Sequence, residues 1–239
     1  MSQPRVVITG VSRRLGLYLA QSFLNEGWEV IGITRSASKE LRDLQNNSIT
    51  IFKVKEYDGE AAAKLGCTIA QQFDFIDVIV HNASFFGRDE DFSDNPVSFF
   101  NKLFQVHMAF PAELNDRLRK NLSMRASSGN IVHITDIYAV DPSEHFSYYC
   151  ATKAGLENLT KSMALRFAPN IRVNSVLPGP IQFLPEHDSA YRSKVLSETP
   201  LKQEGGFGPI YQAICSIIEN PYITGSSIKV DGGRSLKNW

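Results

Sequence analysis

A tyrosine and a lysine four residues apart carry the most distinctive chemistry in this sequence. Tyr149 and Lys153 stand at positions i and i+4 of a segment with helical periodicity, so their side chains lie one above the other on one face. A free phenol has a pKa of about 10, and a neighbouring ammonium favours the phenolate and lowers that pKa. The pair therefore predicts acid–base chemistry near neutral pH.

An aspartate thirteen residues before the tyrosine is expected to join this pair. Asp136 follows the apolar run 131–135, which is typical of a buried strand. Ligands bind beyond the carboxyl ends of the strands in a parallel sheet, and a polar residue placed there faces them. A tyrosine four residues before a lysine is common, so the position of Asp136 decides the interpretation. We predict that Asp136, Tyr149 and Lys153 are catalytic.

A glycine-containing turn links the first predicted strand to the first helix. Gly10 and Gly16 frame the turn, and glycines at such a position let backbone N–H groups approach a pyrophosphate at the helix N-terminus. The usual dinucleotide-binding pattern has another glycine where Arg14 stands. A guanidinium at that position suits a phosphate, or a substrate, above the turn.

The end of the second predicted strand indicates which dinucleotide binds. An NAD site has an acidic residue there, which accepts a hydrogen bond from the ribose 2′-OH. This chain has Arg35 and Ser36, which suit a 2′-phosphate, and Arg13 is a second candidate for the same phosphate. The sequence therefore favours NADPH over NADH.

Strands and helices alternate along the chain. Apolar, β-branched runs predict strands at Arg5–Thr9, Glu29–Thr34, 49–54, 75–80, 131–135, 171–176 and Ser227–Val230. Apolar residues at spacings of three and four predict helices at 15–25, from Ser38, and at 59–73, 96–121, 146–167 and 209–219. This alternation predicts a single Rossmann-type α/β domain over residues 1–239, with a doubly wound parallel sheet of about seven strands. Residues 178–206 have weak periodicity, and we expect them to form a substrate loop.

The order of the motifs resembles that of the short-chain dehydrogenase/reductase family over nearly the whole chain. The shared motifs are the glycine turn, Asn82-Ala83, the tyrosine–lysine pair, Pro178-Gly179 and Asp231-Gly232-Gly233. The resemblance implies that Tyr149 is the proton donor and that Lys153 holds the nicotinamide ribose and lowers the tyrosine pKa. It implies cofactor binding by Gly10, Ser12, Arg13, Arg14, Leu15, Gly16, Arg35, Ser36, Asn82, Ala83, Ser84, Thr135, Tyr149, Lys153, Pro178, Gly179 and Ile181.

Two departures from the usual family pattern resemble its pteridine reductase branch, which includes bacterial dihydromonapterin and dihydrofolate reductases. Asp136 stands where the family usually has a serine, and Arg14 stands in the turn. The resemblance implies hydride transfer from NADPH to a dihydropterin (dihydromonapterin, dihydrobiopterin or dihydrofolate), giving the tetrahydro form. It places Phe86 as the aromatic that stacks on the pterin, and implies substrate binding by Arg14, Ser84, Phe86, Asp136 and Tyr149. Of Phe85 and Phe86, at least one is expected to be a packing residue.

Two positions remain open at this point. The family often has an asparagine in the long fourth helix that completes a proton relay, and this chain has His107 there instead. A neutral imidazole can also donate and accept, so the relay is either preserved through His107 or takes another route. The family also offers one aspartate to the adenine after the third strand, where this chain has both Glu56 and Asp58. Neither of these two acidic residues is preferred by the sequence.

Two other functions compete with pterin reduction. A carbonyl reductase such as a 3-oxoacyl-carrier-protein reductase would use the same tyrosine and lysine, but the Asp136 carboxylate would repel the negative charge that develops on a carbonyl oxygen. A non-catalytic NADPH-binding sensor would keep the fold. A sensor has no need of the intact set Asp136, Tyr149 and Lys153.

Composition narrows the classes of partner and location. Lys plus Arg equals Asp plus Glu, so the formal net charge is zero and neither nucleic acid nor an anionic membrane is indicated as a partner. We expect a cytoplasmic protein with free thiols at Cys67, Cys150 and Cys215 and no bound metal. The family resemblance implies a homotetramer, with a homodimer as the alternative.

Overall fold

The computed structural model describes residues 2–44, 48–124 and 129–236 of the chain. Its strands are β1 (Arg5–Thr9), β2 (Glu29–Thr34), β3 (Ile49–Lys53), β4 (Val78–His81), β5 (Gly129–Ile134), β6 (Ile171–Pro178) and β7 (Ser227–Val230). Its α-helices are α1 (Arg14–Asn25), α2 (Lys39–Asp43), α3 (Gly59–Gln72), α4 (Pro96–Phe104), α5 (Phe110–Leu122), α6 (Ser147–Phe167), α7 (Ser189–Ser197) and α8 (Gly208–Glu219). The described strands form one seven-stranded parallel sheet, which confirms the predicted fold class.

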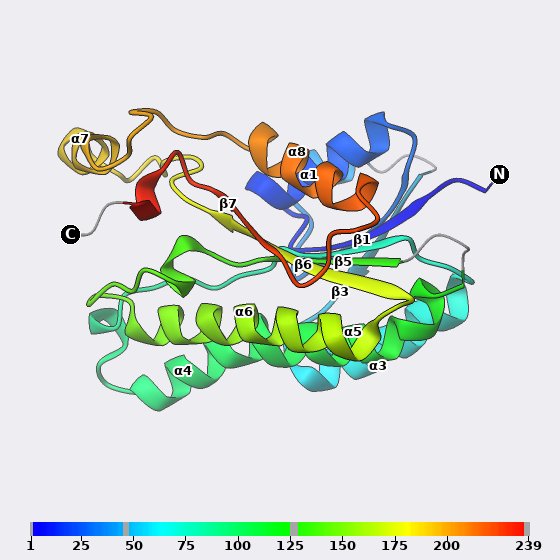
Figure 1. The fold of residues 1–239 in the computed structure, drawn as a ribbon. Coiled ribbons are helices and arrows are strands. Elements are labelled where there is room, and N and C mark those ends of the chain that lie inside the picture. The colour runs from blue at the N-terminus through cyan, green and yellow to red at the C-terminus, as the bar shows by residue number, and fades with distance from the viewer. Residues whose placement is uncertain (1, 45–47, 125–128, 237–239) are drawn as a thin grey trace.

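The strand order places a topological switch in the middle of the sheet. The order is β3-β2-β1-β4-β5-β6-β7, so the chain builds outward from β1 to β3 and then returns to pair β4 on the other side of β1. Helices α1 and α8 cover one face of the sheet, and α3, α4, α5 and α6 cover the other (Figure 1). The crevice beyond β1 and β4 is where such sheets bind ligands.

Alternation along the strands builds a core on each face of the sheet. Val6 and Ile8 of β1 pack with residues of α1 and α8, and Val7 between them packs with residues of α3, α5 and α6. Successive strand side chains point to opposite faces, so a run that is apolar throughout suits a strand covered on both sides. The two cores hold the carboxyl ends of the strands in register.

The structure differs most from the predicted elements in three segments of the chain. The helix expected over 96–121 is interrupted by a π-helical turn, η2 (Gln105–Ala109), between α4 and α5. The strand expected over 75–80 forms only from Val78, and Asp77 just before it accepts a hydrogen bond at Oδ2 from the backbone N–H of Arg5 at 2.8 Å. The expected loop over 178–206 contains α7, which weak apolar periodicity hid and which Asp188 caps.

Three further observations concern membrane-spanning helices, metal sites and cysteines. None of the helices in the described part of the chain combines the length and the apolar composition that crossing a bilayer requires. Within the same residues, no three His, Cys, Asp or Glu side chains are grouped so as to hold a metal ion. Cys67, Cys150 and Cys215 are free thiols.

Two buried histidines join the sheet to the helices below it. His81 on β4 donates from Nε2 to Asn115 Oδ1 at 2.8 Å, and His133 on β5 accepts from Asn115 Nδ2 at 3.3 Å. His133 also donates from Nδ1 to Thr160 Oγ1 at 2.8 Å. Burial lowers the pKa of His81 to about 4, and burial likewise lowers the pKa of His133 well below its ordinary value. Both rings are therefore neutral in the folded protein.

We expect the free energy of unfolding to fall as the pH drops from 7 to 5. Below a pH of about 6.5 the unfolded chain protonates both histidines while the folded chain does not, so acid favours unfolding. His81 alone removes about 2 kcal/mol over this interval. Urea denaturation at several pH values measures how the free energy of unfolding depends on pH. In His81→Gln the loss of stability between pH 7 and pH 5 is expected to be smaller by about 2 kcal/mol. An unchanged slope in the variant would contradict the assignment.

Candidate active site

Most of the predicted residues gather at the carboxyl ends of four adjacent strands. The glycine turn follows β1, Asn82 follows β4, Asp136 lies just after β5 and Pro178 ends β6. These ends lie at one edge of the sheet, around the switch between β1 and β4. Residues distant in the chain meet here: Arg14 Nη2 donates to the carbonyl oxygen of Gln182 at 2.7 Å, across 168 positions.

The three predicted catalytic residues lie together beneath this edge. Tyr149 Oη donates to Asp136 Oδ2 at 2.9 Å, and Asp136 Oδ1 accepts from the backbone N–H of Tyr138 at 2.9 Å. Lys153 Nζ donates to the carbonyl oxygen of Ile134 at 3.0 Å and lies 5.6 Å from the centre of the Tyr149 ring. Tyr149 is 5% exposed and Lys153 is 2% exposed. Helix α6 thus presents a phenol and an ammonium to a carboxylate at the end of β5.

The electrostatics of this trio differ from the sequence prediction. Burial, and then the Asp136 carboxylate, raise the pKa of Tyr149 well above its ordinary value. Burial also raises the pKa of Asp136 and lowers the pKa of Lys153 to about 8. The prediction that Lys153 lowers the tyrosine pKa is wrong for this arrangement, because the phenol is paired with a carboxylate and the ammonium with a backbone carbonyl. Tyr149 is therefore held as a phenol, the form that gives up a proton.

The glycine turn leaves the start of α1 open to an anion. Arg13 at the N-cap makes no side-chain hydrogen bond to the backbone N–H groups of the first turn. A methyl group on Gly16 would lie 2.1 Å from the carbonyl oxygen of Gly10, so this close approach requires glycine. Arg14 has a φ of 51°, in the left-handed region that favours glycine. Uncapped N–H groups beside two arginines fit the pyrophosphate of a dinucleotide.

Some predicted cofactor residues engage their side chains within the protein. Asn82 Nδ2 donates to the carbonyl oxygens of Thr9 at 3.1 Å and Gly10 at 3.3 Å, which ties β4 to the turn after β1. Thr135 is 2% exposed, and its hydroxyl donates to Glu157 Oε1 at 2.6 Å. These two side chains shape the crevice from below, and their hydrogen-bonding groups already have protein partners.

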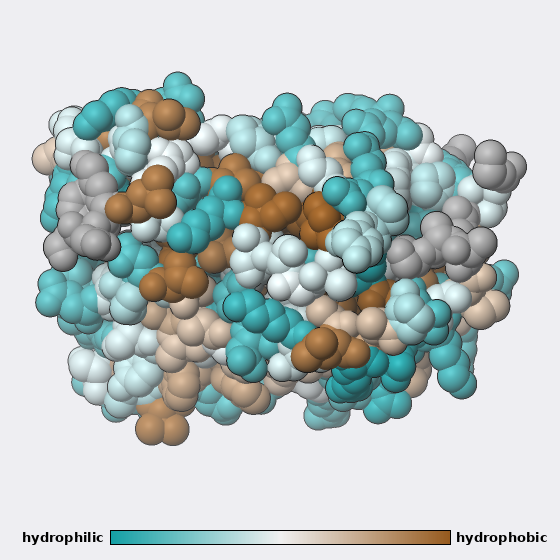
Figure 2. All heavy atoms as spheres, viewed as in Figure 1, coloured by the Kyte–Doolittle hydropathy of each residue, from teal (hydrophilic) through white to brown (hydrophobic). Residues whose placement is uncertain are grey.

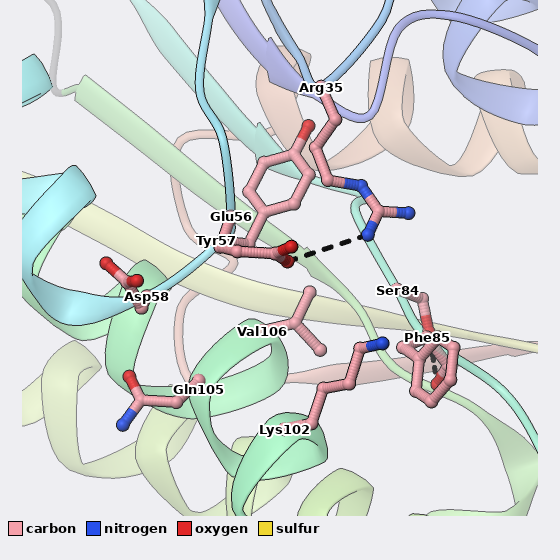
Figure 3. Close-up of a pocket in the computed structure, with 9 residues that line it drawn as sticks. All are labelled: Arg35, Glu56, Tyr57, Asp58, Ser84, Phe85, Lys102, Gln105 and Val106. Carbon is pink, nitrogen blue, oxygen red and sulfur yellow. Dashed lines mark hydrogen bonds and ion pairs between the residues drawn. The ribbon is translucent and has the colours of Figure 1, made fainter.

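A cavity of about 290 Å³ opens beside the glycine turn. Figure 3 shows Arg35 at one end of it and Lys102 reaching in from α4 toward Ser84 and Phe85. The lining residues are Arg35, Glu56, Tyr57, Asp58, Ser84, Phe85, Lys102, Gln105 and Val106. A cavity with apolar walls and cations at both ends fits an adenosine that carries an extra phosphate.

Glu56 and Asp58, the two acidic residues that follow β3, have different partners in the structure. Asp58 Oδ1 accepts from the backbone N–H of Ala61 at 2.8 Å and caps α3. Glu56 Oε2 lies 3.7 Å from Arg35 Nη1, and this ion pair lies in the cavity (Figure 3). Both carboxylates line the cavity, Glu56 beside Arg35 and Asp58 at the start of α3.

Phe86, which is expected to stack on the pterin, lies beside Tyr149. It is 54% exposed, and its ring meets the ring of Tyr149 edge-on, at 4.9 Å between centroids and 88° between planes. Phe85 packs instead against Phe92 and Phe99. The expectation that at least one of Phe85 and Phe86 is a packing residue is therefore confirmed for Phe85.

A second cavity, of about 370 Å³, extends outward from Phe86. Helix α7 and the loop before it form one wall, so the expected substrate loop does border the site. The lining residues are Phe86, Gly87, Arg88, Asp91, Phe146, Glu186, His187, Asp188 and Tyr191. The hydrogen bond from Arg14 to Gln182 ties the glycine turn to the same loop.

Several side chains near the site have contacts that the sequence did not predict. Tyr57 Oη accepts from the backbone N–H of Gly10 at 3.0 Å and donates to the carbonyl oxygen of Ile33 at 2.8 Å, beneath the glycine turn. Lys102 and His107 reach the site from α4 and η2. Only the position of His107, where the family often has asparagine, was visible as a signal in the sequence.

Comparisons with known proteins agree with this geometry. A family model described as enoyl-(acyl carrier protein) reductase matches residues 10–235. A dihydromonapterin reductase from Klebsiella pneumoniae subsp. pneumoniae is 32% identical over 238 residues, which cover 98% of each chain. FolM alternative dihydrofolate reductase 1 from Brucella canis, complexed with NADP, has a TM-score of 0.84 and 26% identity, over 98% of this chain and 95% of that chain. An apo SCOR enzyme from Clostridium thermocellum shares the fold, with a TM-score of 0.87 and 24% identity over 100% and 95% of the two chains.

Proposed function

Because this chain belongs to the short-chain dehydrogenase/reductase family, we propose that it is an NADPH-dependent reductase that converts a dihydropterin to its tetrahydro form. The observation that carries this proposal is the carboxylate of Asp136, which lies 2.9 Å from the Tyr149 hydroxyl where the family usually has a serine. The names of the Klebsiella and Brucella relatives support the same reaction.

The chain's own residues supply the proton and the positioning. NADPH, when bound, supplies the hydride that adds to C6 of the pterin C6=N5 bond. Tyr149, held as a phenol, donates the proton that N5 takes up. Asp136 accepts the hydrogen bond of the Tyr149 hydroxyl and so orients the phenol for this step. Lys153, held on the carbonyl oxygen of Ile134, is the residue expected to hold the nicotinamide ribose.

The cofactor is NADPH, and the first cavity suggests how the chain would recognise it. Arg35 lines this cavity and is proposed to bind the 2′-phosphate together with Ser36 and Arg13, with Glu56 and Asp58 beside the adenosine. The glycine turn, from Gly10 to Gly16, receives the pyrophosphate at the N-terminus of α1. On the nicotinamide side the proposed contacts are Ala83, Ser84, Thr135, Pro178, Gly179 and Ile181, of which Thr135 would act through its backbone.

The charge of the second cavity favours an uncharged pterin side chain. Its lining carries the carboxylates of Asp91, Glu186 and Asp188 against the single guanidinium of Arg88. A dihydrofolate places two carboxylates of its glutamate tail outside the pterin ring, where like charges repel. We infer that a dihydropterin with a hydroxylated, uncharged side chain is the preferred substrate.

NADPH absorbance followed with a panel of substrates tests the proposal. Purified protein is expected to oxidise NADPH with 7,8-dihydromonapterin and dihydrobiopterin, more slowly with dihydrofolate, and not with an acetoacetyl thioester. NADH in place of NADPH is expected to raise the cofactor KM. Turnover of the thioester alone would favour the carbonyl reductase alternative. NADPH binding without turnover of any substrate would favour a sensor.

Exposed apolar side chains support self-association, and we propose a homotetramer, with a homodimer as the alternative. Val97, Phe100 and Phe104 on α4 are 78%, 39% and 43% exposed, and Leu165 on α6 is 84% exposed. Figure 2 shows apolar groups over these lower helices and along the band between α8 and α6. Such patches mark interfaces. We also propose a cytoplasmic location, with neither nucleic acid nor membrane as a partner.

A further inference from the structure

His107 makes a set of buried polar contacts that the proposed mechanism does not use. It lies in the π-helical turn η2, is 1% exposed, and its ring centre is 5.4 Å from that of Tyr149. Its Nε2 lies 2.8 Å from Ser84 Oγ and 3.4 Å from the backbone N of Phe85. Its Nδ1 lies 2.8 Å from Thr152 Oγ1. Both ring nitrogens are thus engaged, and π-helical turns often occur at functional sites.

Two independent contacts determine which ring nitrogen carries the proton. The backbone N–H of Phe85 is a donor only, so Nε2 must accept. The hydroxyl of Thr152 donates to the carbonyl oxygen of Tyr149 at 2.9 Å, so it accepts from Nδ1–H. Burial, and then the charge of Lys153, lower the pKa of His107 well below its ordinary value, which keeps the ring neutral. His107 is therefore protonated on Nδ1, with Nε2 as an acceptor.

This tautomer determines what Ser84 can offer to a ligand. With Nε2 accepting, the hydroxyl proton of Ser84 points inward to His107 at 2.8 Å, a better hydrogen bond than its 3.5 Å contact with the carbonyl oxygen of Phe85. Ser84 is exposed, so the lone pairs of its oxygen face the crevice. The side chain then accepts hydrogen bonds from a ligand and does not donate them.

We propose that His107 is a positioning residue that fixes Ser84 as a hydrogen-bond acceptor and thereby selects a substrate rich in N–H groups over one that presents a carbonyl oxygen. This inference rests on the proposed function. The carboxylate of Asp136, which accepts from the Tyr149 hydroxyl, is a second hydrogen-bond acceptor in the site. A pterin ring offers N–H and NH2 donors to two such acceptors, whereas a ketone oxygen offers only lone pairs, which neither acceptor can bind.

Two matched substitutions distinguish the role of Nδ1 of His107 from the role of Nε2. The amide of Asn reaches about as far as Nδ1, so His107→Asn keeps a donor for Thr152 and loses the acceptor for Ser84. The amide of Gln reaches about as far as Nε2, so His107→Gln keeps an acceptor for Ser84 and loses the contact with Thr152. His107→Asn is expected to weaken pterin affinity about tenfold, whereas His107→Gln is expected to keep the affinity within about threefold of wild type.

Affinity is read without turnover, from the fluorescence of oxidised biopterin titrated into protein saturated with NADP⁺. Ser84→Ala removes the acceptor itself, at an exposed position where folding does not depend on it, and is expected to weaken binding about as much as His107→Asn. In the double variant the two losses should not add, because both act on one hydrogen bond. The dissociation constant of NADP⁺ measured alone for His107→Asn and His107→Gln checks that the cofactor site is intact in these variants.

The outcomes are distinct. A wild-type protein that neither binds nor reduces a pterin refutes the proposed function itself. A wild-type protein that does both, combined with additive losses in the double variant or with His107→Gln as weak as His107→Asn, overturns the role of His107 alone. Should His107→Asn fail to fold, the comparison of His107→Gln with Ser84→Ala still decides, since only the second is expected to lose affinity.

Discussion

Tyr149→Phe is expected to lower kcat for a dihydropterin by about 10²–10⁴-fold, the usual contribution of a positioned general acid. The phenyl ring that remains keeps its packing beside Phe86 and His107, so the cavity walls are unchanged. The variant loses only the hydroxyl, which is the proton donor and the partner of Asp136 at 2.9 Å. The loss should therefore appear in kcat rather than in NADPH affinity.

Single-turnover NADPH oxidation, together with NADPH binding by fluorescence, measures this effect. Tyr148→Phe is the matched control, because Tyr148 is the preceding residue on α6 and its ring packs against Phe99 and Phe100, away from Asp136. The control is expected to keep kcat close to that of wild type. Nearly normal turnover in Tyr149→Phe would remove Tyr149 from the reaction and require a different proton donor.

Asp136→Ser is expected to lower kcat/KM for a dihydropterin by about 100-fold. The carboxylate accepts from the Tyr149 hydroxyl and from the backbone N–H of Tyr138, and hydrogen bonds to a charged group contribute about 1.5–3 kcal/mol each. A serine hydroxyl is shorter and uncharged, so it cannot make both contacts. The substitution also restores the residue usual in the family.

The same substrate panel measures this variant, with Asp141→Ser as the control. Asp136 caps a short 3₁₀ turn, Ile137–Ala139, and Asp141 lies just beyond this turn. Asp141 does not line either cavity. Asp136→Ser is expected to lose dihydropterin turnover while thioester reduction stays the same or rises, because the negative charge that opposes a developing oxyanion is gone. Unchanged dihydropterin turnover would show that the carboxylate does not select the substrate.

Local patterns along the chain are enough to predict most of the fold. Buried strands of a parallel sheet are apolar throughout, and helices repeat apolar residues every three to four positions, so both can be recognised within a few residues of chain. The strands Arg5–Thr9 and Glu29–Thr34 agree with their predicted bounds to the residue. The interruption of the long helix at η2 and the existence of α7 escape such patterns, because their apolar spacing depends on packing partners elsewhere in the chain.

The amino-acid sequence specifies the chemical types in the site: a phenol and an ammonium one helical turn apart, a carboxylate after a strand, and an arginine where a 2′-phosphate would bind. How these groups act on one another depends on the folded arrangement. Folding pairs Tyr149 with Asp136, which keeps the tyrosine a phenol, and it places His107 between Ser84 and Thr152. Burial and contacts between distant segments set pKa values and proton positions, and neither is encoded in spacing along the chain.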